Sequence, residues 1–243
     1  MRVYIVIFFA MLFMCNTSEI SNKLSNLDLS SSRKNELTKE EVIRGLKEAL
    51  KIGTQKAVNI VSKKDGFWNN PLIRIPIPEK LKNVTDKLSR LGFKKDVQKF
   101  HKQLNIAAEK SSKKALNIFV EQITKITFED AIVILTGNDS SITTYFKEKT
   151  YEKLYTEFKP DVNNTLNDLK IIAFYEKLID IYNKIPLVKK VNFDLTNYVT
   201  EKTLEGLFLE LKNQEKNIRN KEVFRETKLL KRVFDKNNWH WNR

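Results

Sequence analysis

Cysteine and histidine are scarce in this chain of 243 residues, which has one cysteine and two histidines. With a single thiol, no intramolecular disulfide can form in any compartment. The same scarcity excludes the usual zinc sites built from imidazole and thiolate ligands, and it leaves a Ser-His-Asp triad only His101 or His240 as its base. Six glycines and five prolines leave few positions at which a helix would be interrupted.

Sequence motifs of the common active sites are also missing. The chain contains no GxGxxG or GxxxxGK[ST] phosphate-binding loop, no HExxH, no GxSxG and no DxDxDG calcium loop. Gly137 and the polar residues after it are better explained as a helix stop followed by a helix cap. We therefore predict no catalytic residue, no metal site and no cofactor.

Positive charge is abundant, since Lys and Arg outnumber Asp and Glu by 44 to 30. Such an excess can indicate a nucleic-acid partner. Here the basic residues are dispersed, often stand beside glutamate as in 147–157, and are not interleaved with aromatic residues in a binding motif. The pattern favours a solvated lysine-rich surface. A looser alternative is attraction to anionic lipid headgroups, at about 1 kcal/mol for each lysine.

The first fifteen residues are typical of an export signal, with a short basic start followed by an apolar run from Val3 to Met14. As a helix this run is about 18 Å long, well short of the roughly 30 Å of a bilayer core. Cys15 is either the acylated first residue of a lipoprotein or part of a signal that is removed. Leu12 agrees with acylation, whereas Phe13 and Met14 occupy positions where small residues are expected.

The rest of the chain divides into three parts. Residues 16–37 are rich in Ser and Asn and are predicted to form a flexible tether, 38–234 a single helical domain, and 235–243 a loose tail. Apolar residues that recur every three or four positions predict about eight helices, over 38–61, 79–91, 94–125 (one helix or two), 127–135, 140–158, 166–182, 194–218 and 223–234. Pro160 and Pro186 are expected to end two of them. The predicted fold class is all-α and bundle-like.

One segment, 65–78, departs from the helical pattern. Three prolines and one glycine in its fourteen residues exclude a regular helix. Its apolar content is nevertheless too high for a free loop, because it includes Phe67, Trp68, Leu72, Ile73, Ile75 and Ile77. We predict an ordered, proline-rich loop that packs against the helices.

Arg74 lies among apolar neighbours of this loop, and an unpaired buried charge is costly. Its guanidinium must therefore bind carboxylates or carbonyls, or face a cavity. In one interpretation Arg74 simply fixes the loop onto the helices. In the other it holds a ligand carboxylate or phosphate at the mouth of a helical pocket. The second interpretation makes Asp65, Asn70, Arg74, Asn105 and Glu109 the candidate ligand-binding residues, with Asn105 and Glu109 one helical turn apart.

Several stretches of the sequence follow one another in a recognisable order: GLKEAL with Gly53 (45–53), DGFWNNPLIRIPIPEKL (65–81), LNIAAE (104–109), TFEDAIVILTGNDSSITTYFKEKT (127–150), Pro160, LTNYVTEKTLEGLFLEL (195–211) and LLKRVF (229–234). Together they resemble the bacterial exported proteins grouped as domain of unknown function 4197. The chain departs from that pattern at Leu104-Asn105-Ile106, where the family has Met-Asn-Arg, so no role of an arginine there is carried over. The resemblance implies export and one helical domain, and it implies no activity.

Two classes of function remain open. The first is a non-enzymatic protein of the bacterial envelope, periplasmic or membrane-tethered, that binds an envelope protein or an amphiphilic small molecule. Export argues against a nucleic-acid partner, and contact with the membrane is expected only through the signal or a lipid anchor. The alternative is an enzyme of unrecognised type with a pocket around Arg74 and with Asp65 or Glu109 as acid or base. A deep pocket that contains Arg74 and a carboxylate would favour the enzyme.

Overall fold

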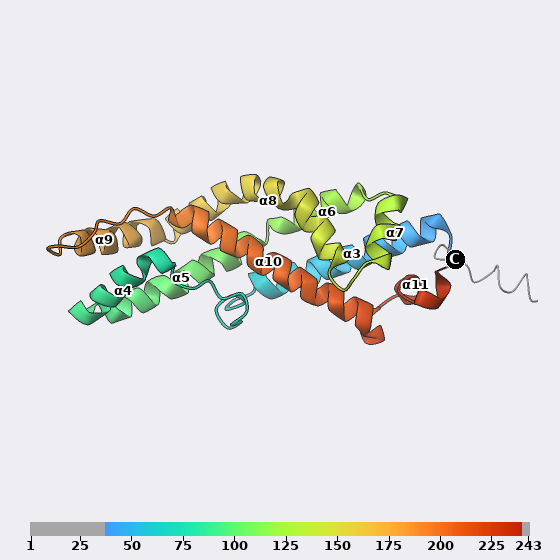
Figure 1. Ribbon diagram of the computed structural model, residues 1–243, viewed down its shortest axis with the longest axis horizontal. Helices are drawn as coiled ribbons and strands as arrows, with labels where there is room; N and C mark the ends of the chain where they lie inside the picture. The colour runs from blue at the N-terminus through green and yellow to red at the C-terminus, as the bar shows by residue number, and fades with distance from the viewer. Residues whose placement is uncertain (1–36, 240–243) are drawn as a thin grey trace, which may run out of the picture.

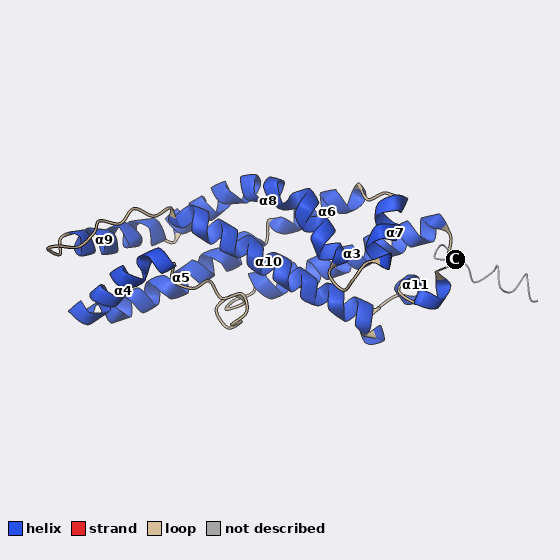
Figure 2. Ribbon diagram, in the orientation of Figure 1, coloured by secondary structure: helices blue, strands red, loops and turns tan. Residues whose placement is uncertain are grey.

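The protein is mostly helical over the part that the computed structural model describes, residues 37–239. Nine α-helices lie in this part, seven of them nine residues or longer, and the described residues form no strand (Figure 2). The predicted all-α fold class is confirmed. The predicted export signal 1–15, Cys15 and the tether as far as residue 36 lie outside the described residues.

Most of the elements are joined by short connections, apart from the longer segments 63–78 and 184–194. Their bounds are α3 (Lys39–Ser62), η1 (Glu79–Leu81), α4 (Lys82–Leu88), η2 (Ser89–Phe93), α5 (Lys94–Ser112), α6 (Ala115–Thr124), α7 (Phe128–Thr136), α8 (Ser141–Asp168), α9 (Ile171–Asn183), α10 (Leu195–Asn220), η3 (Glu222–Phe224), α11 (Lys228–Val233) and η4 (Lys236–Asn238). The stretch 94–125 thus contains two helices, which was one of the two possibilities left open by the sequence.

The helices form an elongated body in which α10 is the central element (Figure 1). α10 packs against α8, α3 and α5. One end of the body is built from α3, α6, α7 and α11, and the other from α4, α5 and α9 (Figure 1). Among the described residues, no helix is both long enough and apolar enough to cross a bilayer.

The starts of α3, α7 and α10 are capped as the sequence indicates, whereas the Ser140 side chain makes no capping hydrogen bond at the start of α8. Thr38 and Glu41 form a capping box at the start of α3, and Thr127 and Asp130 form another at the start of α7. The Asp194 side chain accepts a hydrogen bond from the third residue of α10. These caps need only residues three positions apart, which is why the sequence alone locates them.

The prediction that a helix ends near Pro160 is wrong, because α8 continues through this proline to Asp168. Proline removes one backbone hydrogen bond. Val162 and Leu166, however, continue the buried stripe of Leu154 and Phe158, and burial of these side chains favours an unbroken helix. The break comes instead at Lys170, whose φ of 56° is left-handed.

The predicted loose tail 235–243 also needs a correction over its first five residues. Asp235 caps the 3-10 turn η4. The indole of Trp239 is buried and its Nε1–H donates to the carbonyl of Val233 at 2.8 Å. A large buried aromatic ring with its polar group satisfied stabilises the end of the domain. Residues 240–243 lie outside the described part.

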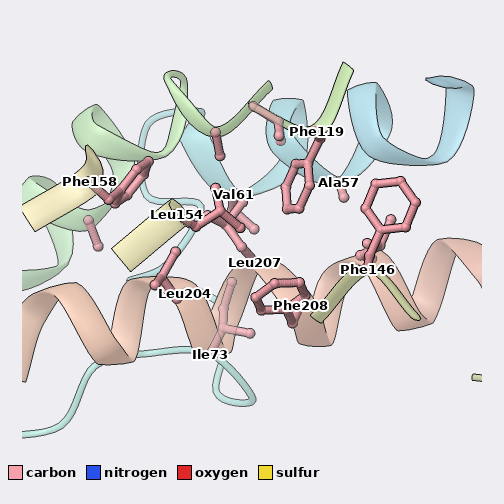
Figure 3. Packing of buried hydrophobic residues seen from close by; sticks show 14 of the residues in the cluster. Ala57, Val61, Ile73, Phe119, Phe146, Leu154, Phe158, Leu204, Leu207 and Phe208 are labelled. Atoms are coloured by element: carbon pink, nitrogen blue, oxygen red, sulfur yellow. The ribbon is translucent and has the colours of Figure 1, made fainter. Parts of the chain in front are cut away.

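The core is continuous and is rich in aromatic residues. Phe119 of α6 contacts Phe146 of α8 and Phe208 of α10, with ring centroids 5.8 and 5.9 Å apart (Figure 3). Ala57 and Val61 of α3 lie in the same packing region. A core filled in this way fixes α10, and α10 in turn carries one wall of the site described below.

A buried ion pair holds the junction of α7 and α8. The Glu215 carboxylate accepts hydrogen bonds from the backbone amides of Ile142 and Thr143, both at 2.9 Å, at the start of α8. Arg219 donates to Glu215 and to the carbonyls of Ile134 and Leu135 at the end of α7. One pair of α10 side chains therefore satisfies the free ends of two other helices.

Candidate functional site

The 65–78 loop projects from the side of the body next to α5 and α10 (Figure 1). It leaves α3 through a tight turn in which Asp65 has a left-handed φ of 60°. Gly66 follows, and a Cβ there would lie 2.5 Å from the carbonyl oxygen of Ile60. Only glycine fits this approach to the helix end. The prediction of a non-helical, ordered segment agrees with this path.

Apolar anchors attach the loop to α10. Phe67 is fully buried and Ile73 nearly so. Their contact with α10 depends on Gly206, where a Cβ would lie 2.6 Å from a ring carbon of Phe67 and 3.3 Å from the Cβ of Ile73. Ile73 reaches from the loop toward α10 (Figure 3). A glycine in the middle of this helix thus provides the space into which the loop packs.

Glu109 of α5 fixes the first turn of the loop. Its carboxylate accepts hydrogen bonds from the backbone amides of Asp65 at 3.1 Å, Phe67 at 3.2 Å and Trp68 at 3.3 Å. The side chain is buried, at 4% exposure. Burial raises the pKa of Glu109 above its ordinary value, although the three backbone hydrogen bonds act in the opposite direction. This carboxylate is thus fully occupied by the loop backbone.

Asn105, one turn before Glu109, fixes the far side of the loop. Its Oδ1 accepts from the Ile75 amide at 2.8 Å, and its Nδ2 donates to the Ile75 carbonyl at 3.0 Å. His101 Nε2 lies 2.9 Å from the same carbonyl. Burial lowers the pKa of His101, which favours the neutral ring. From α10, the Tyr198 hydroxyl donates to the carbonyl of Pro76 at 3.0 Å.

Arg74 lies on the outer side of the loop and is exposed. Its Nε donates to the Trp68 carbonyl at 2.5 Å, and its guanidinium carbon lies 5.1 Å from the centre of the Trp68 ring. The Trp68 ring in turn makes an edge contact with His101. The sequence left carboxylates, carbonyls or a cavity as possible partners of Arg74, and the hydrogen bond in the structure is to a carbonyl. No ion pair among the described residues involves Arg74.

A hollow of about 220 Å³ lies between the outer side of the loop and α10. We call it the Arg74 hollow, and it is lined by Leu72, Ile73, Arg74, Pro76, Lys202, Glu205, Gly206 and Leu209. Lys202 and Glu205 pair with each other at 2.6 Å. Helical spacing alone does not tell which face of α10 meets the loop, so the sequence does not point to Lys202, Gly206 or Tyr198.

The five predicted site residues thus lie around one loop but do not line one cavity. Asn105 and Glu109 bind its backbone from α5. Asp65 forms a distant ion pair with Lys102 at 3.7 Å. Asn70 accepts from the amide of Leu72 and thereby stabilises a local turn. Arg74 alone of the five lines the hollow. Whether any of them binds a ligand stays a prediction.

Two of the larger hollows, of about 530 and 540 Å³, lie where α8, α9 and the start of α10 meet. They share Asn163, Asp194 and Thr196, and they contain none of the predicted site residues. Over residues 37–239 no three side chains of His, Cys, Asp or Glu gather closely enough to hold a metal ion.

The fold and the loop define the class of this protein: an elongated all-α domain with one ordered loop bound across two of its helices. Residues 36–235 match the model of the family described as "Protein of unknown function (DUF4197)", and the chain belongs to this family. This confirms the resemblance that the sequence motifs indicate. No curated protein and no solved structure gives a significant match.

Proposed function

We propose that this protein is exported to the bacterial envelope, periplasmic or tethered to the membrane, and acts there as a non-enzymatic interaction module. Export is supported by the sequence of residues 1–15, which has the layout of a signal. The working surface in this proposal is the outer side of the 65–78 loop.

One observation carries the proposal: the loop is held from beneath while apolar and charged side chains remain exposed on its outer side. Glu109 and Asn105 bind its backbone, and Phe67 anchors it in the core. On the outer side Leu72 is 73% exposed and Arg74 is exposed beside it. A surface ordered before binding loses little conformational entropy when a partner docks.

The enzyme alternative receives less support from the same geometry. Small-molecule sites usually enclose about 300–1,000 Å³, whereas the Arg74 hollow measures about 220 Å³. Neither Asp65 nor Glu109, the carboxylates proposed as acid or base, lines that hollow. The one carboxylate that does, Glu205, is paired with Lys202. Glu109 is committed to three backbone amides.

Chemical cross-linking of intact cells, followed by fractionation, tests the proposal. We expect the full chain in the envelope fraction and in a specific cross-linked complex. The complex should be lost with Leu72→Ser and retained with Leu91→Ser, because Leu91 is a comparably exposed leucine, at 58% exposure, that lies in η2 and not in the loop.

Two results would contradict the proposal: recovery of the chain from the cytosol, or a complex equally sensitive to both leucine substitutions. Native mass spectrometry of the chain purified from the envelope tests the amphiphile alternative. Added mass that leaves on denaturation would identify a small molecule as the bound partner instead.

A further inference from the structure

We propose that the Arg74 hollow binds an acidic side chain, flanked by an apolar residue, on a partner protein. This inference rests on the proposed interaction function and names the chemistry of the partner. It follows from the charge, the size and the rigidity of the hollow.

The charge of the hollow is positive and only partly compensated. Two cations, Arg74 and Lys202, face a single carboxylate, Glu205. Glu205 lies 2.6 Å from Lys202, so the ion pair leaves the arginine without an acidic partner among the described residues. An arginine in this state favours a carboxylate brought by another molecule.

The guanidinium is held in position for such a contact. Its Nε donates to the Trp68 carbonyl at 2.5 Å, and its guanidinium carbon lies 5.1 Å from the centre of the Trp68 ring. With Nε engaged by the loop, the two Nη groups are the donors that remain for a carboxylate. Because the arginine is already ordered, binding costs less side-chain entropy than it would for a free arginine.

The apolar rim supplies the second part of the recognition. Leu72 is 73% exposed and Leu209 is partly buried at the other side of the hollow. Arginine is one of the residues enriched at interface hot spots, which are ringed by contacts that exclude water. The partner is therefore expected to place an apolar side chain against Leu72 when its carboxylate meets Arg74.

The size of the hollow favours a protein over a free small molecule. Its volume of about 220 Å³ lies below the usual range of enclosed ligand pockets. It can hold one side chain of a larger surface, which would cover Leu72 and exclude water from the ion pair.

Site-specific photo-cross-linking of the full chain in its own cells tests this inference. The photoreactive residue p-benzoylphenylalanine replaces Asn69, an exposed residue of the loop outside the hollow. We expect one protein adduct, whose yield falls at least ten-fold with Arg74→Glu and less than three-fold with Arg74→Lys. Arg90→Glu is the matched control, because Arg90 is an exposed arginine in η2. It should leave the yield unchanged.

The sequence of the cross-linked partner peptide shows which side chains the partner places near the hollow. We expect an Asp or Glu beside an apolar residue, and we expect that changing this acid to Lys restores the adduct in the Arg74→Glu chain. An adduct that persists unchanged in Arg74→Glu would overturn the inference while leaving the interaction function standing. A lipid adduct would overturn the choice of a protein partner. The absence of any adduct from Asn69 and from a second position, Lys202, would overturn both proposals.

Discussion

Asn105 pairs with both backbone groups of Ile75, accepting from its amide at 2.8 Å and donating to its carbonyl at 3.0 Å. The side-chain amide thus takes the place that a neighbouring strand would have in a sheet. Because Asn105 is fully buried, this pairing occurs where water cannot compete. It explains how a loop without secondary structure keeps one path across the helices.

Replacement of Asn105 by Ala is expected to destabilise the protein by about 2–4 kcal/mol, because it leaves the buried amide of Ile75 without an acceptor. Denaturant unfolding followed by circular dichroism measures the change. The control is Asn167→Ala, since Asn167 is exposed and its side chain donates a hydrogen bond to the carbonyl of Asn163 in the same helix. Its cost should stay within about 0.5 kcal/mol. Equal costs at the two positions would contradict the role given to Asn105.

Glu109 gives a pH dependence of defined sign. Burial raises its pKa in the folded state above the ordinary 4.5, so the folded protein binds this proton more tightly than the unfolded chain. Its contribution to stability is complete below the unfolded pKa and is lost as the pH rises through the folded pKa. We therefore expect the free energy of unfolding of wild type, minus that of Glu109→Gln, to fall as the pH rises above about 4.5.

The subtraction removes the contributions of other carboxylates that titrate in the same range, including Glu41 and Asp130, whose pKa values are lowered. If the difference between the two unfolding free energies instead rises with pH, the three loop amides lower the pKa of Glu109 more than burial raises it. Glu109→Ala, which removes every acceptor from those amides, should cost about 3 kcal/mol or more at any pH in this range.

Much of the fold could be predicted from the sequence because the signals are local. Helical spacing and caps such as Thr38 with Glu41 involve residues one turn apart. The ion pair of Glu215 and Arg219 could not be predicted in this way. Its backbone partners lie more than 70 residues away, and a Glu and an Arg four positions apart are equally common on a solvated helix surface.

The candidate site was only partly predictable for a related reason. The loop composition indicates order, and the spacing of Asn105 and Glu109 places them on one face of α5. The sequence does not reveal that backbone amides, rather than a ligand, would face them. At Pro160 the local rule gave the wrong helix end, because burial of Val162 and Leu166 outweighs the one backbone hydrogen bond that the proline removes.

Two glycines in long helices should respond to alanine with opposite signs. At Gly206 a Cβ would lie 2.6 Å from the buried Phe67 ring, so overpacking should cost about 1–3 kcal/mol despite the gain in helix propensity. At Gly53 the nearest atom would be 3.6 Å away, an ordinary contact. Gly53→Ala should therefore stabilise the protein by up to about 1 kcal/mol. Thermal unfolding measures the change in stability of each variant relative to the wild type. A Gly206→Ala variant as stable as the wild type would contradict close packing of the loop on α10.

The buried pair of Glu215 and Arg219 should show strong coupling in a double-mutant cycle. Glu215→Ala leaves a buried guanidinium without its carboxylate and two helix-start amides without their acceptor, and we expect a loss of about 3–5 kcal/mol. Arg219→Met should also be costly. The double variant should lose clearly less than the sum of the two, by about 1–3 kcal/mol. Simple additivity would mean that the two side chains cap their helices independently.

The interaction function requires that the 65–78 loop is ordered before any partner binds. Hydrogen exchange of the purified protein, measured at the backbone amides of Phe67, Trp68 and Ile75, tests this order. We expect these amides to exchange about as slowly as those of α5, because they are held by Glu109 and Asn105. Exchange at the rate of an unstructured chain would contradict it, since the outer side of the loop would then be no preformed surface.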